Sequence, residues 1–406
     1  MIVTGFFKWI FGKATSALQG ATGVQLLNSY DNTFAPYDGN AWNIPQVRAA
    51  VNAFAKNAAK VSPRHIKRGG GTFEEVNSNI NRILRQRPNP YMTAFDMYYK
   101  VAAMYKLTNN AFIYPVWEGS RLVALYPILA TRITLMEYRG ELFCAMEFAG
   151  GKLHHLPYDE LIHIRGHFYS RDVFGDTNKA LESVLETSTA LNESIRTFAK
   201  LISVVRGILK VKLGTKDENI TRARDDFVRD NLRIDKNGAG VIAYDSRLEY
   251  EPIKDNPTPI PAGSLKYISD QINNYLGISE KIIRNDFREF EWNSFYEGEL
   301  EPFFILLSQA LTNGLFTERE QGHGNEIVAE ANRLQYASVA SKVSAVKTLS
   351  ALGLLTYDQA LDIFNMPPIG GEEGARRVQS LNFANTRIID EYQSGKEEEN
   401  DSNAES

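Results

Sequence analysis

The chain has 406 residues, of which 43% are hydrophobic and 23% are charged, a composition typical of globular proteins with two or three domains. Its 45 basic and 49 acidic side chains give a formal net charge of -4. This balance argues against a protein whose main role is tight nucleic-acid binding, because such proteins carry a clear basic excess. Seven acids and one base lie in residues 388–406, so the remainder of the chain is slightly basic. We expect this acidic segment, which lacks apolar periodicity, to be a disordered tail.

The single cysteine, Cys144, excludes an intramolecular disulfide and a multi-cysteine metal site, which fits assembly in a reducing cytosol. Its apolar, strand-like surroundings predict a core position. No uncharged apolar run approaches the roughly 20 residues of a membrane-spanning helix, so no membrane partner is expected. Residues 1–40 are poorly periodic and are expected to form a peripheral arm.

Residues 41–178 combine helical and strand-like patterns. Apolar positions recur at helical spacing between Ile44 and Ala58, and Thr93 is expected to cap the start of a second helix. Five short apolar runs separated by turn residues then predict an antiparallel meander: residues 111–117, 122–126, 132–138, 142–148 and 161–168.

Two longer amphipathic helices follow, on either side of a small unit. Apolar residues three and four apart predict a helix over 179–205, about 40 Å long, which needs a packing partner along its length. A second helix is predicted over 264–276 and stops at Gly277. Between them, strands at 207–213 and 240–244 and a charged helix at 222–232 suggest an insertion on a two-helix stalk. The apolar positions expected to pack are Leu191, Ile195, Phe198, Ile202, Ile268 and Ile272.

The part of the chain after Gly277 is charged and then helical. Residues 280–290 are loop-like, and helical periodicity over 292–311 is expected to be broken by Pro302. Residues 280–301 contain seven acids and three bases. A further helix is predicted over 329–352, and Thr356 with Gln359 resembles a capping box for another.

No catalytic or metal-binding motif is evident. His163 and His167 lie in a strand-like run, where a spacing of four separates side chains by about 13 Å, too far for one zinc ion. There is no Gly-x-Ser-x-Gly elbow, Rossmann fingerprint or kinase motif set. The alternating acids Glu297, Glu299 and Glu301 are more typical of a solvated or channel-facing surface than of an acid/base pair. We therefore expect no enzyme activity, no cofactor and no metal.

The order of several local strings resembles the portal proteins of tailed bacteriophages, the head-to-tail connector family. The strings are Arg87-Pro-Asn-Pro-Tyr91, Asn109-Asn-Ala-Phe-Ile-Tyr114, Leu161-Ile-His-Ile-Arg165, residues 268–277 with 293–302, Leu352-Gly-Leu-Leu-Thr356 and Met366-Pro-Pro-Ile-Gly-Gly371. Together they cover about residues 85 to 375, and their order is more specific than any one string. The family often has Val-Pro after the second stem helix, where this chain has Ile278-Ser279, so the boundaries of the following loop are open.

The resemblance implies an α+β protomer with a β-rich wing, a two-helix stem, a small α/β clip and a helical crown. Its parts would be an N-terminal arm (1–40), wing (41–178), stem helix 1 (179–205), clip (206–258), stem helix 2 (259–277), tunnel loop (278–292), tunnel helix with wing return (293–328), crown helices (329–387) and acidic tail (388–406). The candidate channel-facing residues are Lys281, Arg284, Arg288, Glu289, Glu291 and Trp292. The three bases either touch passing phosphates or pair with acids such as Asp286 and Glu289 between subunits.

The resemblance also implies function and partners. The chain would form a homo-oligomeric ring, expected to be a dodecamer, at the head vertex of the virion after assembly in the host cytoplasm. Its channel would pass double-stranded DNA non-specifically during packaging and ejection. Large terminase, a head completion or adaptor protein, capsid protein and scaffold would be its partners. Two alternatives remain: another phage head structural or adaptor protein, and a soluble hydrolase with a site near His163 or Glu299.

Overall fold

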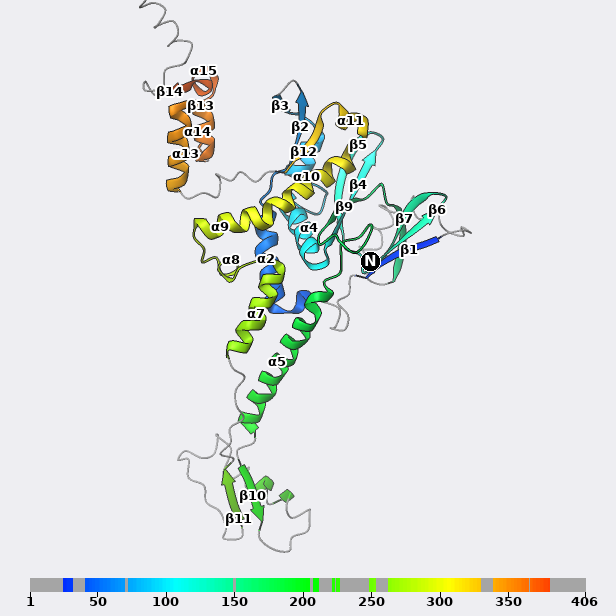
Figure 1. Ribbon diagram of the computed structural model, residues 1–406, viewed down its shortest axis with the longest axis vertical. Helices are drawn as coiled ribbons and strands as arrows, with labels where there is room; N and C mark the ends of the chain where they lie inside the picture. The colour runs from blue at the N-terminus through cyan, green and yellow to red at the C-terminus, as the bar shows by residue number, and fades with distance from the viewer. Residues whose placement is uncertain are drawn as a thin grey trace, which may run out of the picture. The chain divides into compact units, whose positions relative to one another are not determined.

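The computed structural model describes residues 25–31, 41–69, 72–148, 151–204, 207–211, 221–222, 224–226, 248–252, 262–329, 339–364 and 366–379 (Figure 1). The chain divides into two units. The first comprises Met1–Thr33, Trp42–Asn178 and Leu276–Ser406, and the second comprises Phe34–Ala41 and Lys179–Tyr275. Helices combined with small antiparallel sheets confirm the predicted α+β class.

After η2 (Ala41–Asn43), whose first residue belongs to the second unit, the helices of the first unit are α2 (Pro45–Ala58), α3 (Asn79–Arg85) and α4 (Ala94–Thr108). The predicted cap at Thr93 is confirmed: its hydroxyl accepts a hydrogen bond from the Asp96 amide (3.2 Å), and its own amide donates to the Asp96 carboxylate (3.0 Å). Such a reciprocal pair satisfies two amides that would otherwise lack partners in the first helical turn.

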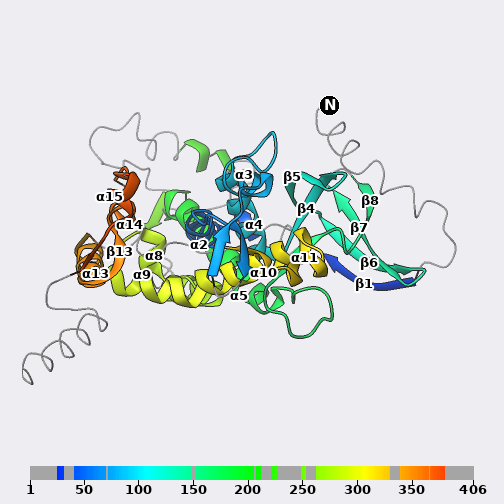
Figure 2. The ribbon, with the colours of Figure 1, turned by 90° about the horizontal axis from the view of Figure 1, so that it is seen from above.

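A nearly continuous helical run follows Gly277, which the sequence predicts only in part. It consists of α8 (Glu280–Arg284), α9 (Glu289–Phe295), the π-helical turn η4 (Tyr296–Leu300), α10 (Glu301–Leu315) and the short α11 (Glu318–Gly322). The stretch expected as a loop over 280–290 is thus mostly two short helices joined at residues 285–288. Figure 2 shows α10 extending from α9 towards the β-sheets.

Pro302 does not break this run, contrary to expectation. It lies within the first turn of α10, directly after the π-helical turn. Proline has no N–H to give to the carbonyl four residues earlier and its ring clashes with that carbonyl in a regular α-turn. The wider π turn over Tyr296–Leu300 accommodates both effects, so the helix continues.

An aromatic cluster joins these helices. The Phe54 ring of α2 meets the Phe303 ring of α10 edge to face, with centroids 5.5 Å apart, and Tyr105 of α4 lies 5.1 Å from Phe303. Phe54 and Phe303 are fully buried. The far end of α10 approaches β9 (Ile162–Arg165) so closely that a Cβ at Gly314 would lie 2.3 Å from the Ile162 side chain. Glycine is therefore required where this helix crosses the sheet.

The expected meander is instead divided between two sheets. β4 (Asn110–Glu118), β5 (Arg121–Ile128) and β9 form one sheet in the order β5-β4-β9. The other has the order β1-β6-β7-β8, formed by β1 (Gln25–Asp31), β6 (Arg132–Tyr138), β7 (Glu141–Phe148) and β8 (Lys152–Pro157). β1 lies within the segment expected as an arm, and β8 was not predicted. Cys144 is fully buried in β7, as predicted, and burial raises the pKa of its thiol to about 12.

Asn109 and Asn110 hold the end of α4 against the loop that follows β9. Asn109 takes the left-handed conformation (φ 55°) that ends the helix, and its side-chain amide donates to the carbonyl of Asp176 (2.8 Å). The Asn110 Oδ1 accepts from the Gly175 amide (2.7 Å). A Cβ at Gly175 would lie 2.3 Å from the Asn109 carbonyl oxygen, so only glycine fits there. The Asn109-Asn110 string is therefore a structural junction.

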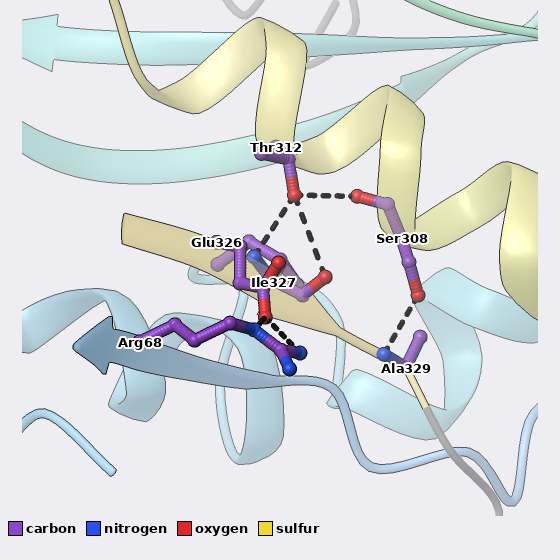
Figure 3. A network of polar contacts seen from close by, with 6 residues as sticks. All are labelled: Arg68, Ser308, Thr312, Glu326, Ile327 and Ala329. Carbon is purple, nitrogen blue, oxygen red and sulfur yellow. Dashed lines mark hydrogen bonds and ion pairs between the residues drawn. The ribbon is translucent and has the colours of Figure 1, made fainter. Parts of the chain in front are cut away.

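The third sheet of the first unit has the order β12-β2-β3, formed by β2 (Arg64–Gly69), β3 (Thr72–Glu75) and β12 (Asn325–Val328). Figure 3 shows how α10 covers the outer edge of β12. The Thr312 hydroxyl accepts from the Ile327 amide (2.9 Å), and the Ser308 hydroxyl accepts from the Ala329 amide (2.8 Å). Side chains of α10 thus satisfy backbone groups that would otherwise be an open sheet edge.

The remaining elements lie in the second unit and near the C-terminus. The second unit contains α5 (Lys179–Val204), β10 (Gly207–Val211), β11 (Leu248–Pro252) and all but the last residue of α7 (Ala262–Leu276). β10 and β11 are antiparallel, and the strand predicted at 240–244 lies outside the described residues. Near the C-terminus are α13 (Val339–Ala351), β13 (Leu352–Thr356), α14 (Tyr357–Ile363), α15 (Gly371–Ala375) and β14 (Arg377–Gln379).

The helix predicted over 329–352 is confirmed only over Val339–Ala351, because Leu352 already begins β13 and residues 330–338 lie outside the described part. The predicted capping box of Thr356 and Gln359 is confirmed, with the Thr356 amide donating to the Gln359 side chain (3.0 Å).

Candidate functional site

The candidate channel residues lie on α8, α9 and the connection between them. Lys281 is paired with Glu291, and Arg284 is paired with Glu280 one turn earlier at 2.5 Å. Within the protomer these two bases bind acids of the same chain, and pairing with Asp286 or Glu289 of a neighbouring subunit stays a prediction. The hydrogen bond from Lys281, together with one from the Arg288 backbone amide (3.0 Å), lowers the pKa of the Glu291 carboxyl. These contacts hold α8 and the start of α9 together.

Trp292 differs from the expectation of an exposed channel residue. Its side chain is buried, with the ring 5.4 Å from Phe287 and 5.8 Å from Phe295. Ile282 of α8 is buried as well. The exposed aromatic residue of α9 is Phe290, at 79% of its full surface. The resemblance implies a channel-facing Trp292, whereas α9 turns this side chain into the protein.

Three lysines reach this segment, and the sequence alone did not identify them: Lys56 of α2, Lys60 just after α2, and Lys106 of α4. Lys56 donates to the Asn285 side chain (2.9 Å), Lys60 lies over the Trp292 ring (5.8 Å), and Lys106 is paired with Glu299. They offset most of the excess negative charge that residues 280–301 carry.

Lys106 also fixes the point where the chain leaves α7. Its ammonium donates to the Leu276 carbonyl (3.1 Å) and lies 4.7 Å from the Phe54 ring centroid. Gly277 follows with φ +72°, and a Cβ there would lie 1.8 Å from a Glu299 carboxylate oxygen. The glycine therefore provides both the left-handed turn and the space for the carboxylate. This geometry lies directly before Ile278-Ser279, where the sequence left the loop boundary open.

The residues expected to pack the stem have different surroundings in the protomer. Ile268 and Ile272 of α7 are buried, Leu191 of α5 is half-buried, and Ile195 keeps 36% of its surface exposed. The side chains of Phe198 and Ile202 lie outside the described residues. The deeply buried positions of α5 are Leu181, Leu185 and Ser188, all in its first half; the predicted apolar face of the helix includes Leu181 and Ser188 but not Leu185.

The contacts of His163 are those of a residue that supports the fold. Its Nε2 lies 3.0 Å from the Asn110 Oδ1, and its Nδ1 lies 3.0 Å from the Tyr158 hydroxyl. Burial, with a smaller contribution from the charge of Arg165, lowers the pKa of His163 to about 3. β9 ends at Arg165, so the predicted strand alternation does not extend to His167, which has φ 44°. With both ring nitrogens bonded and a strongly lowered pKa, His163 is poorly suited to act as a base at neutral pH.

The described part of the chain contains no group of three or more His, Cys, Asp or Glu side chains positioned to hold a metal ion. Among the same residues, no helix combines the length and apolar character that a membrane span requires.

We compared the chain with protein families, curated sequences and solved structures. The sequence profile of the phage portal protein family matches residues 45–365. A search of curated protein sequences gave no match. Similar solved structures include the neck of an empty gene transfer agent (GTA) particle computed with C6 symmetry, with TM-score 0.58, 14% identity and coverage of 82% of this chain and 92% of that chain.

A second is the neck of a native GTA particle computed with C12 symmetry, with TM-score 0.54, 14% identity and coverage of 82% and 91%. A third is the virion of a native GTA particle, with TM-score 0.56, 15% identity and coverage of 83% and 96%. At these identities the structural likeness supports the fold, and the sequence profile supports the family. Because the profile spans most of the chain, from α2 to α14, this protein belongs to the phage portal protein family.

Proposed function

We propose that the protein forms a ring of twelve subunits at the head vertex of a phage particle, with a central channel through which the genome is packaged and ejected. The observation that carries this proposal is the match of the portal family over residues 45–365, which includes α5, β10, β11, α7 and the helical run up to α10. Neck structures of GTA particles, computed with C6 and C12 symmetry, share the fold. Twelve copies would supply neighbours for Ile195, which the protomer leaves partly exposed.

In this proposal the second unit contains the stem and clip, and the clip is the docking site for large terminase during packaging and for a head completion protein afterwards. The segment from α8 to α9 lines the channel, and the C-terminal helices form the crown. Capsid protein and scaffold are the partners at the outer side of the ring. Assembly takes place in the host cytoplasm.

The charges of the α8–α9 segment suit a channel through which DNA slides. Lys281 and Arg284 are neutralised within the chain by Glu291 and Glu280. Every fixed contact between a base and a phosphate adds salt-dependent affinity, which would hold DNA in place. Paired bases keep such contacts weak, so the wall neither repels nor retains the duplex. The ring itself needs no catalytic group, because ATP hydrolysis in this proposal belongs to terminase.

Electron microscopy of the purified protein tests the proposal. The expected result is a closed ring with a central hole in views along its axis. Compact monomers at high protein concentration would overturn it. A hydrolase, the alternative of a different class, would instead lose activity on single substitutions at His163 or Glu299. The bonded, low-pKa His163 and the Lys106-paired Glu299 argue against that alternative.

A further inference from the structure

The four-stranded sheet β1-β6-β7-β8 is largely apolar on both faces (Figure 2). One face belongs to the described core cluster, through Ile133 and Leu135 of β6, Cys144 and Met146 of β7, and Leu156 of β8. Successive side chains of a strand point to opposite faces, so the residues between these positions lie on the other, outer face. The outer face is formed by Thr134, Met136, Phe143, Ala145, His155 and Pro157.

The outer face is shielded from water, although the core cluster lies on the other side of the sheet. Phe143 and Ala145 each keep only 5% of their surface exposed. The Nδ1 atom of His155 is also hidden from solvent. Because side chains stand roughly perpendicular to a sheet, a phenylalanine loses this much of its surface only when another segment packs over it. The burial of Phe143 therefore indicates a cover on this face.

The segment before β1 has an apolar pattern that suits such a cover. Residues 1–24 lie outside the described part of the chain, and residues 1–40 as a whole lack a regular period, but residues 3–18 match helical spacing. At roughly 100° per residue, their apolar side chains, Trp9 excepted, fall within an arc of about 140°. The larger members of this arc, which we call the apolar side of the segment, are Phe6, Phe7, Ile10, Phe11 and Leu18.

β1 brings this segment to the correct sheet. β1 is an edge strand, and its first residue, Gln25, pairs with Glu137 beside the β6–β7 turn. The adjacent position, Met136, pairs with Phe143, so Phe143 lies two strand spacings, about 10 Å, from β1. Residues 19–24 can span up to about 20 Å, which is enough to reach it. A helix over 3–18 would be about 24 Å long, close to the length of β7.

We propose that residues 3–18 form an amphipathic helix whose apolar side packs on the outer face of the β1-β6-β7-β8 sheet of the same chain. The helix covers Phe143 and Ala145, and the core cluster leaves it no place on the opposite face. Burial of its phenylalanine, isoleucine and leucine side chains drives the packing. This assignment does not depend on the proposed ring, because both parts belong to one chain.

Thiol labelling of the full-length protein tests this packing. Ala145→Cys places a small reactive side chain on the outer face, whereas the native Cys144 is fully buried on the other face. Adding Phe7→Asp/Ile10→Asp puts two charges on the apolar side of the segment. Maleimide labelling at position 145 should then be about tenfold faster or more, because the cover detaches.

The matched control is Thr15→Asp/Gln19→Asp, which adds the same charge outside the apolar side and should leave the labelling rate unchanged. Equal rates in the two double variants would overturn the proposal. Mass spectrometry also reads Cys144, which should stay unlabelled while the sheet is folded. If Cys144 becomes labelled, Phe7→Ala/Ile10→Ala replaces the charged pair, and faster labelling at position 145 alone is again the expected result.

Mixed assemblies identify the chain that supplies the cover. Chains with Ala145→Cys and an unaltered segment are co-expressed with an excess of chains that carry only Phe7→Asp/Ile10→Asp. Labelling should stay slow, because each chain covers its own sheet. Fast labelling would show that the segment comes from another copy and would overturn the same-chain assignment. Equal labelling of all variants, with phosphatidylserine-vesicle binding that Phe7→Asp/Ile10→Asp abolishes, would assign the segment to a lipid surface instead.

Discussion

The Lys106 ammonium donates to the Leu276 carbonyl at 3.1 Å, so a side chain from α4 binds the last residue of α7. A cation is favourable there because the final carbonyls of a helix carry partial negative charge. The same ammonium is paired with Glu299 in the π turn, and only 12% of the lysine side chain is exposed. One lysine therefore fixes the point where the chain turns from α7 towards α8.

We expect Lys106→Met to destabilise the protein by about 2 kcal/mol, because it leaves the Glu299 carboxylate partly buried without its partner. The value lies between those of an exposed and a fully buried pair, since Glu299 keeps 26% of its side-chain surface. Urea unfolding followed by circular dichroism measures it. The matched control is Arg85→Met, which breaks the more exposed pair with Glu75 and should cost less than about 1 kcal/mol. Equal losses in both variants would contradict a special role for Lys106.

Gly277→Ala should lower the free energy of unfolding more than the same substitution at another glycine with positive φ. Gly119 also has positive φ, but a Cβ there would meet nothing within 4 Å, so Gly119→Ala should cost only about 1 kcal/mol. Gly277→Ala adds a clash that displaces Glu299 from Lys106, for a total of about 2 to 3 kcal/mol. In a Glu299→Ala background the two alanine substitutions should cost the same. A persistent difference there would show that the clash with Glu299 is not the cause.

Features set by neighbouring residues in the chain were predictable. The N-cap at Thr93 and the capping box at Thr356 were predicted from residues close in the chain, and α5 ends within one residue of its expected boundary. The pairing of strands was not predictable, since β1 pairs with β6, more than a hundred residues later, and β8 has mixed polar and apolar residues.

The sequence predicted which segment of the chain contains the candidate site, but not the contacts of its side chains. Lys106 and Glu299 are 193 residues apart, so a count of charges within 280–301 could not include the lysine. The resemblance implies a channel-facing Trp292, but the fold buries its ring against Phe287 and Phe295. The π turn before Pro302 was missed because helical periodicity continues on both sides of it.

The half-exposed stem residue Ile195 should matter to the ring more than to the protomer. We expect Ile195→Asp to lower the free energy of unfolding by about 1 kcal/mol and to leave the protomer folded, because 36% of the side-chain surface is exposed to solvent. It should nevertheless prevent ring formation, measured by light scattering and electron microscopy. Ile272→Asp, at a fully buried position, should instead unfold the protomer itself. An intact ring from Ile195→Asp would refute its assignment to subunit packing.

Stability should decrease in mild acid, partly through His163. Its pKa is lowered to about 3 in the folded chain, whereas in the unfolded chain it is near 6.5, so between these values the unfolded state binds more protons. Stability from this group is therefore complete above about pH 6.5 and falls by about 2 kcal/mol on going to about pH 5. His163→Gln should flatten the pH dependence measured by urea unfolding. An equally steep dependence in His163→Gln would contradict the assignment.

The channel role of α8 and α9 is best tested by point substitutions. Deleting residues 281–292 would remove Ile282 and Trp292 from the core, so misfolding would obscure any effect on DNA. Arg284→Glu/Arg288→Glu changes two exposed side chains and should alter the free energy of unfolding by no more than about 0.5 kcal/mol. Rings should form normally, but added negative charge on every subunit should repel the duplex and leave few particles filled. The measurement is the amount of packaged DNA per particle, with Arg121→Glu as the control. Normally filled particles from the double variant would show that these two arginines do not face the channel.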